Sequence, residues 1–294
     1  MMGARRVAAL GAVLLAVSWH CDAGAAFERG WPRAREAGMA GTSGGLLESV
    51  ALAATQDLDG RGAPARGGGP GRQTRGGAAR WDLSFSGGRL YGLSEASGSA
   101  ARVCARSPSM SVAVEFSRFG SGLYAEHAAT ILVARPVAAD LWGAVRCRGL
   151  GIAADGAPGR WSAAGDAALA WRLLGRLSLG VAYENLGRSK IGRSPLASSA
   201  SAGVALMLDA LTLAASVTTE PGFTPSLAVG CDAALSSWLR LRSGIATEPG
   251  RFAVGLGFGD ATSAERSRRP AVDVAWEWHP QLGVSTFVTV SYQL

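Results

Sequence analysis

The chain has 294 residues, of which 48% are hydrophobic and only 17% are charged, and 41 are glycines. No apolar run of 18 or more residues follows the first twenty positions, which argues against a protein that crosses a membrane with helices. Low charge, abundant glycine and apolar residues spread along the whole chain are typical of a transmembrane β-barrel.

The net charge of +7 rests almost wholly on arginine, since Lys190 is the only lysine. A nucleic-acid-binding surface would gather such charges on one face with aromatic residues between them. Here the arginines are scattered along the chain. The sequence therefore predicts no nucleic-acid partner.

The cysteines show neither a C-x-x-C spacing nor accompanying histidines. They are Cys21, Cys104, Cys147 and Cys231. Zinc sites usually show such a pattern, so we expect no metal site and no cofactor. The three cysteines after residue 25 are an odd number and do not indicate a disulfide framework.

Residues 1–25 have the pattern of a secretory signal peptide. They open with a basic start, continue with an apolar core too short to span a bilayer, and end with small residues at 23–25 that suit cleavage. A lipoprotein site at Cys21 is the alternative, but His20 before it is too bulky for that processing. The sequence therefore predicts export from the cytoplasm.

Residues 26–60 form a separate segment, in which apolar residues recur near helical spacing between 46 and 58. We expect a short helix there, and a segment that folds into a barrel as a plug; a loose periplasmic arm is the alternative. Residues 61–80 are rich in glycine and arginine and cannot bury a core, so we expect a flexible segment.

From residue 81 to residue 294 the hydrophobic pattern has a period of two, which indicates strands. For example, Leu177, Leu179, Val181 and Tyr183 alternate with Ser178, Gly180, Ala182 and Glu184. The second face carries mainly glycine, alanine, serine and threonine with isolated charges. Such a face is too small and uncharged for the exterior of a soluble sandwich, which is the alternative, and suits the interior of a barrel.

We expect an all-β fold, a transmembrane antiparallel barrel of fourteen strands, with twelve as the alternative because the first two strands are weak. The predicted strands are 81–86, 89–93, 109–116, 122–135, 140–153, 163–174, 176–185, 200–209, 211–219, 225–236, 238–247, 251–260, 270–279 and 284–294. Longer connections are predicted near 154–162, 186–199 and 261–269, the first two outside the cell and the third inside.

Aromatic residues fall near the ends of the predicted strands, as in the interfacial girdles of membrane barrels. They are Trp142, Trp171, Tyr183, Trp238, Phe258, Trp276, Trp278 and Tyr292. The last stretch, 284–294, is a two-faced strand of the kind on which outer-membrane barrels end. Phe287 is the exception on its polar face, and we expect it to pack against the plug or a bound lipid.

Several short motifs, in this order along the chain, resemble the PorV-like family of outer-membrane proteins, which is related to the FadL-type long-chain fatty-acid transporter barrels. They lie at 116–126, 182–187, 239–249, 252–259 and 279–283. Residues 34–42 look like the family's Ala-Arg-x-x-x-Met-Gly-Gly-Ala start, although out of register, and the Gly/Arg segment stands where the family carries Asn-Pro-Ala. The resemblance implies a fourteen-stranded barrel with an N-terminal plug. Characterised relatives include lipid-uptake barrels and a shuttle for secreted proteins of the type IX pathway.

Charged residues on the small-residue face are the candidate lumen lining. They are Arg146, Arg148, Glu184, Asp232, Arg240, Arg242, Asp273 and Glu277. Arginines two apart share a face, so they could form a cationic lining that holds a fatty-acid carboxylate or another anion. The alternative is that they pair with the acids of facing strands or with the plug.

A barrel enzyme at the outer rim, the second alternative for function, would need a histidine beside a serine or a carboxylate. Glu126 and His127 are neighbours on a strand and so face opposite sides, and His279 lies at a strand end before Pro280. We therefore expect rim histidines and no enzyme.

The sequence predicts a non-enzymatic barrel of the PorV/FadL type in the outer membrane, in contact with its lipid. It would pass a hydrophobic or small solute past the plug, or serve as a docking or shuttle partner for secreted proteins in surface export. The first role predicts an apolar pocket between plug and wall. The second predicts a filled lumen and function in the loops 154–162 and 186–199.

Overall fold

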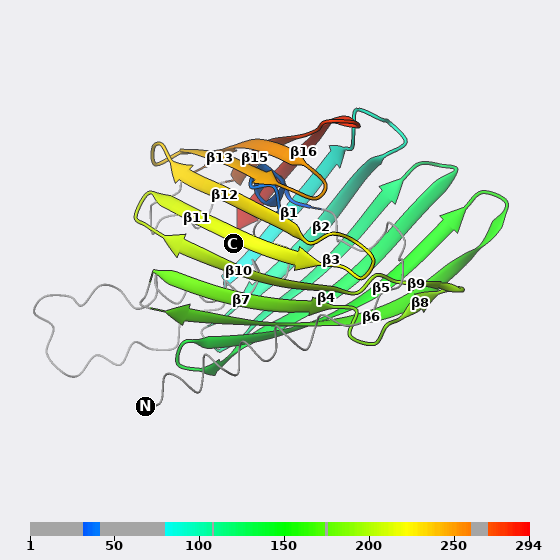
Figure 1. Cartoon of the computed structure of the whole chain (residues 1–294), viewed down its shortest axis with the longest axis horizontal. Coiled ribbons are helices and arrows are strands. Elements are labelled where there is room, and N and C mark those ends of the chain that lie inside the picture. Colours follow the sequence, from blue (N-terminus) through cyan, green and yellow to red (C-terminus); the bar gives the residue numbers. More distant parts are fainter. Residues whose placement is uncertain (1–31, 42–79, 108, 174–175, 260–269) are drawn as a thin grey trace, which may run out of the picture.

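A computed structural model describes residues 32–41, 80–107, 109–173, 176–259 and 270–294 (Figure 1). Fourteen antiparallel strands close into a barrel, in which each strand bonds to the next along the chain and β1 closes against β16. This confirms the predicted all-β fold and its fourteen strands. A two-stranded sheet, β8–β9, stands apart from the barrel in the connection between β7 and β10.

The barrel strands are short on one side and long on the other. They are β1 (Arg80–Arg89), β2 (Ser97–Arg106), β3 (Ser111–Gly120), β4 (Tyr124–Ala138), β5 (Leu141–Ala154), β6 (Ala157–Leu173), β7 (Leu177–Glu184), β10 (Ser199–Met207), β11 (Leu211–Thr219), β12 (Ser226–Ala234), β13 (Leu239–Ala246), β14 (Arg251–Phe258), β15 (Pro270–His279) and β16 (Gly283–Gln293). We call the end where β16 stops the C-terminal rim and the other end the opposite rim.

The predicted second strand, 89–93, is wrong. Tyr91 and Gly92 have φ angles of +52° and +73°, so this stretch turns at the opposite rim and cannot be extended. The second strand is Ser97–Arg106. Its pattern was weak because its outward face holds serine and alanine beside a single valine, and two arginines lie on its inward face.

The predicted long connection at 154–162 is also wrong. β5 and β6 are joined by Asp155 and Gly156 alone, and Gly156 has a φ of +70°, as expected for an Asp-Gly hairpin turn. The connection predicted at 186–199 does exist and contains β8 (Lys190–Ile191) and β9 (Ser194–Pro195). The connection predicted at 261–269 lies outside the described residues.

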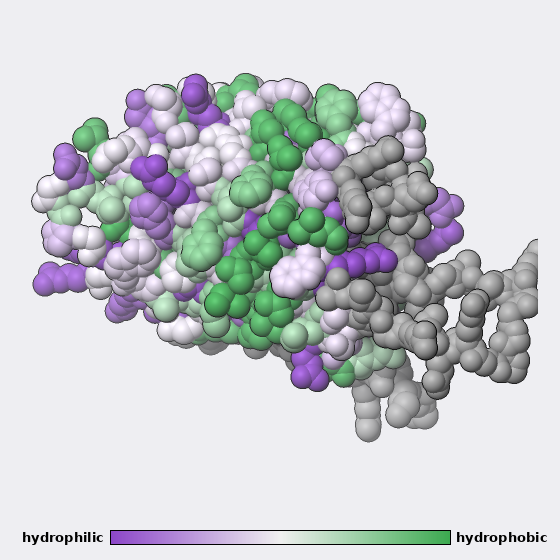
Figure 2. Space-filling view, turned by 180° about the vertical axis from the view of Figure 1, so that it is seen from behind, coloured by the Kyte–Doolittle hydropathy of each residue, from purple (hydrophilic) through white to green (hydrophobic). Residues whose placement is uncertain are grey.

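Large apolar side chains point outward and small ones point inward. Exposed apolar residues within strands include Phe116, Val145, Val229 and Ile245. The core consists largely of alanines with a few larger side chains. Figure 2 shows apolar side chains gathered in a band over the outer surface of the strands. This distribution is the reverse of a soluble sandwich and follows from the two-faced pattern of the sequence.

Residues 32–41, here called the inner segment, lie inside the barrel against β13–β16 (Figure 1). The segment contains the short helix α2 (Ala34–Gly38), which the sequence did not predict. The backbone N–H of Ala34 donates to Thr289 Oγ1 at 3.0 Å. No helix within the described ranges is long and apolar enough to cross a bilayer.

Glycines let the inner segment approach the wall. A Cβ on Gly244 would lie 2.4 Å from the carbonyl carbon of Met39, and one on Gly38 would lie 3.2 Å from the Cα of Gly255.

The signal peptide predicted at 1–25, the helix predicted at 46–58 and the flexible segment predicted at 61–80 fall outside the described residues, apart from Arg80.

Phe287 is buried against the inner segment, in one cluster with Ala34, Ala37 and Ala275. This confirms the expectation that the one large residue on the inward face of the last strand packs against this segment. The side chain fills space that the small residues of the wall leave open.

We expect Gly244→Ala to displace the inner segment while the barrel stays closed, because the added methyl group would overlap the backbone of Met39. Single-channel conductance in planar bilayers should rise, while the shift in gel migration between unheated and heated samples should persist. Gly165→Ala is the control, since a Cβ there meets open space. Equal conductance of both variants and the wild type would contradict the expectation.

Candidate functional site

The lumen holds a cavity of about 600 Å³ between the inner segment and the wall of the barrel. One side is apolar and includes Ala113, Leu132, Leu150 and Ile152. Ile191 and Leu196, which lie in the connection between β7 and β10, complete this side. Serine and threonine side chains from β10–β12 line another side, and arginines and glutamates complete the wall.

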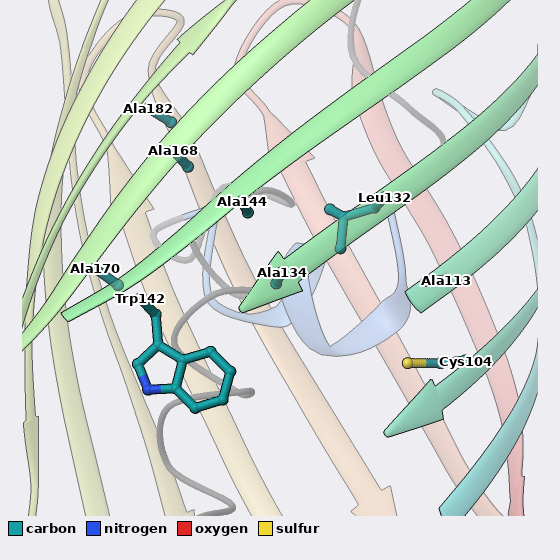
Figure 3. Close-up of a cluster of buried hydrophobic side chains, with 9 residues drawn as sticks. All are labelled: Cys104, Ala113, Leu132, Ala134, Trp142, Ala144, Ala168, Ala170 and Ala182. Carbon is teal, nitrogen blue, oxygen red and sulfur yellow. The ribbon is translucent and has the colours of Figure 1, made fainter. Parts of the chain in front are cut away.

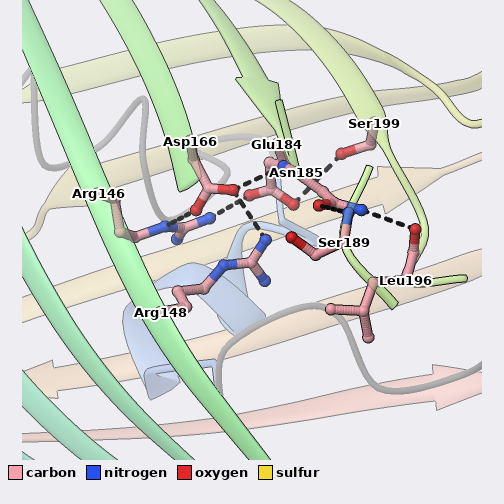
Figure 4. Close-up of polar contacts among 8 residues, drawn as sticks. All are labelled: Arg146, Arg148, Asp166, Glu184, Asn185, Ser189, Leu196 and Ser199. Atoms are coloured by element: carbon pink, nitrogen blue, oxygen red, sulfur yellow. Dashed lines mark hydrogen bonds and ion pairs between the residues drawn. The ribbon is translucent and has the colours of Figure 1, made fainter. Parts of the chain in front are cut away.

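The first charged cluster centres on Asp166 of β6, which is fully buried (Figure 4). Its carboxylate accepts from Arg146 Nε and, at 2.8 Å, from Arg148 Nη2, both on β5. Arg146 Nη2 also donates to Glu184 Oε1 of β7 at 2.6 Å. The cluster contains two guanidinium groups and two carboxylates, so their formal charges cancel.

The Asp166 cluster also holds the chain that leaves β7. The backbone N–H of Asn185 donates to Asp166 Oδ1 at 2.7 Å, and Asn185 Nδ2 donates to the carbonyl of Leu196 at 2.7 Å (Figure 4). Asn185 Oδ1 accepts from the backbone N–H of Ser189 at 2.8 Å. Asn185 is fully buried and has a φ of +55°, a conformation that asparagine tolerates better than most residues.

The second charged cluster centres on Asp232 of β12, also fully buried. Arg240 Nε donates to its Oδ1 at 2.8 Å, while Arg242 Nε and Arg35 Nη2 lie 3.3 and 3.4 Å from its Oδ2. Arg35 belongs to the inner segment, so this carboxylate ties the segment to the wall.

Arg242 extends the second cluster to β15 through Asp273. The pair passes over β14 at Gly257, where a Cβ would lie 2.6 Å from Asp273 Oδ1 and 2.8 Å from Arg242 Nη2. The glycine is therefore needed for this contact. On the same wall, Arg251 Nη1 donates to Glu277 Oε2 at 3.2 Å.

All eight candidate residues from the sequence take part in these ion pairs, as the pairing alternative describes. Four of them, Arg146, Arg148, Glu184 and Glu277, line the cavity. The other four belong to the second cluster, which Arg35 of the inner segment joins. Sequence reasoning missed Asp166, although a lone acid on the small-residue face of a predicted strand was a usable signal.

An apolar cluster continues from the cavity along the inner faces of β2–β7 (Figure 3). It shares Ala113, Leu132 and Ala182 with the cavity wall and reaches Trp142 near the C-terminal rim. Trp142 was predicted to belong to an outer aromatic girdle, and this is wrong, because its side chain is buried on the inward face. Trp238 and Phe258 do stack on the outside at that rim, with ring centroids 6.5 Å apart.

His279 is a rim histidine, as expected, whereas the same expectation for His127 is wrong, because His127 lies within β4 and lines the cavity. His279 Nδ1 accepts from the backbone N–H groups of Gln281 and Leu282 at 3.2 Å, and its ring meets Tyr91 edge-on. The imidazole thus closes the turn between β15 and β16. Among the residues that the structure describes, no group of three or more histidine, cysteine or acidic side chains could hold a metal ion.

No protein-family model matches the chain. No curated protein matches it either. Several solved structures match the chain. The Pseudomonas putida toluene transporter TodX has a TM-score of 0.60 at 11% identity, with 91% of this chain and 98% of that chain covered. The CymD monoaromatic hydrocarbon channel has a TM-score of 0.57 at 11% identity, over 91% and 98%. A Pseudomonas aeruginosa FadL homologue has a TM-score of 0.53 at 12% identity, over 92% and 99%. The likeness confirms a FadL-like barrel fold, while the PorV-like resemblance stays a prediction.

We expect Asp232→Ala to lower the free energy of unfolding by about 3–5 kcal/mol, because it leaves guanidinium groups of the lumen without their carboxylate. Urea titration of the protein in lipid vesicles measures this. Asp209→Ala is the control, since Asp209 and its partner Arg176 are 93% and 63% exposed and such surface pairs contribute little. A similar loss in both variants would contradict the assignment of Asp232.

Proposed function

We propose that this protein is an outer-membrane barrel that admits a small, uncharged, apolar compound into its lumen and passes it toward the periplasm. The observation that carries the proposal is the cavity with an apolar side inside a barrel whose outer surface is apolar. The transporters and channels that share the fold are in keeping with a non-enzymatic role.

The outer surface supports a place in a membrane. Phe116, Val145, Val229 and Ile245 lie within strands, and each exposes more than half of its surface. Exposure of such an apolar surface to water costs free energy, whereas lipid tails cover it without that cost. We place the opposite rim, where the predicted extracellular stretches 154–162 and 186–199 lie, outside the cell, and the C-terminal rim in the periplasm, as in single-chain outer-membrane barrels.

The cavity suits an apolar ligand of modest size. Its volume of about 600 Å³ falls within the usual range for sites that hold small molecules. The apolar side chains of the wall extend from Leu150 and Ile152 through Leu132 to Trp142 near the C-terminal rim. This wall offers an apolar surface from the cavity toward the periplasmic end.

The paired charges argue against an anionic ligand beside Arg146 and Arg148. A carboxylate that bound there would have to replace Asp166 or Glu184, which already hold these arginines at hydrogen-bond distance. The displaced carboxylate would remain buried, which is costly. We therefore favour an uncharged compound over a fatty-acid carboxylate at this position.

The cavity also favours uptake over the docking role. Docking of secreted proteins predicted a filled lumen, whereas the described residues enclose open space next to the inner segment. The apolar side of the cavity suits a small apolar compound, and docking of a secreted protein would not require it.

Cells that make this protein should take up radiolabelled toluene faster than cells that carry an empty vector, behind an intact lipopolysaccharide layer. We expect Leu150→Asn to lower the rate roughly tenfold, because a buried leucine contributes about 1.5–3 kcal/mol to contact with an apolar ligand. Met207→Asn is the matched control, since Met207 faces inward on β10 but does not line the cavity.

Liposome swelling separates this proposal from a general porin. Proteoliposomes should swell in arabinose no faster than empty liposomes. Rapid swelling in arabinose, or equal toluene uptake with and without the protein, would refute the proposed function.

A further inference from the structure

We propose that the connection between β7 and β10, residues 185–198, is a latched gate over the cavity, and that Asp166 and Asn185 form its latch. The gate admits the apolar compound from outside, so this inference rests on the proposed function for its cargo. The latch itself is argued from the contacts of the connection, here called the gate loop.

The gate loop folds inward and forms part of the cavity wall. Ile191 and Leu196 are its only buried apolar side chains, and they pack with Leu150 of β5 and Ala164 of β6. Its remaining side chains from 186 to 198 are exposed or half-buried. Two apolar side chains therefore account for the burial of the loop, and release of the loop would remove both from the wall.

The latch lies at the start of the gate loop. Leu186 follows Asn185, and its backbone N–H donates to the carbonyl of Gly165 at 2.8 Å. With Asn185 N–H bound to Asp166, two successive amides hold this corner to β6. The left-handed conformation of Asn185 turns the chain away from the line of β7.

The side chain of Asn185 ties the start of the gate loop to its end. Its amide reaches the carbonyl of Leu196 and the N–H of Ser189. Ser199, the first residue of β10, donates to Glu184 Oε2 at 3.2 Å and so closes the base of the loop (Figure 4). One buried polar cluster thus holds both ends.

Cleavage at Lys190 can be used to measure how often the gate loop opens. Lys190 is the only lysine of the chain, and it lies exposed in β8, paired with Pro195 of β9. A lysine-specific endoprotease can therefore cut the full chain at one place only. Cleavage needs an extended, accessible segment, so its rate reports how often the gate loop opens.

The test compares variants of the full-length protein in outer-membrane preparations. Asn185→Gly keeps the left-handed backbone but removes both side-chain hydrogen bonds. Asn185→Asp keeps one oxygen acceptor, loses the donor to Leu196 and sets a second carboxylate beside Asp166. Arg188→Gly is the matched control, because Arg188 is exposed, also has a positive φ of 48°, and lies in the same loop.

We expect cleavage at Lys190 to rise about tenfold in both Asn185 variants, the change that loss of one or two hydrogen bonds produces, and to stay near the wild-type rate in Arg188→Gly. Toluene uptake should rise with cleavage. Saturating toluene should slow cleavage of the wild type, because a ligand packed under Ile191 and Leu196 stabilises the closed loop.

Equal cleavage of the wild type and both Asn185 variants, each with the gel shift of a folded barrel, would overturn the latch. Faster cleavage with unchanged toluene uptake in protein that does transport toluene would overturn the gate. Faster cleavage in a protein that takes up no toluene would support the latch and refute the proposed cargo instead.

Discussion

Two buried carboxylates, Asp166 and Asp232, hold the interior of this barrel. A membrane barrel presents its large apolar side chains to lipid, so they cannot pack into a core. The inward face is left with alanine, glycine and serine, which bury little surface. Asp166 joins β5, β6 and the gate loop, and Asp232 joins β12, β13 and the inner segment. Asp166 accepts hydrogen bonds from three groups, and Asp232 lies beside three guanidinium groups, which offsets the cost of burying these carboxylates.

Small residues make these polar contacts possible. Gly257 leaves room for Arg242 to reach Asp273 across β14, and Gly244 admits the backbone of the inner segment. Larger residues at these positions would push the segment and the arginine away from the wall. The apolar side of the cavity lies against the opposite part of the barrel, on β3–β6, which the one helix of the described residues does not reach. The division of the lumen into a filled side and an open side thus follows from where the glycines fall.

The alternating pattern was sufficient to predict the closed fourteen-stranded barrel and which face of each strand points inward. It failed for Ser97–Arg106, whose outward side chains are too small to mark a face. The candidate charges and their pairing with acids of facing strands were predicted from their shared face, but Asp166 was missed. Arg146 meets Asp166 because the register of the β5–β6 hairpin places them opposite each other. The sequence did not predict this register, because a long connection was expected at 154–162 where the structure has a two-residue turn. Asn185 gave no signal, since its role depends on one left-handed backbone angle.

Because the strands differ in length, the wall of the barrel is higher on one side than on the other. With a rise of about 3.3 Å per residue, the 17 residues of β6 extend over roughly 55 Å. The 8 residues of β14 extend over roughly 26 Å by the same rise. Barrel strands tilt by about 45°, so β6 rises through roughly 40 Å and β14 through roughly 18 Å. Since a hydrocarbon layer is about 30 Å thick, the end of the β5–β6 hairpin at the opposite rim would extend beyond it on one flank. The guanidinium of Arg160, on this raised hairpin, lies against Gly192 of the gate loop. A molecule that entered the lumen from the opposite rim would therefore pass the long β5–β6 hairpin on one flank and the short strands β13 and β14 on the other.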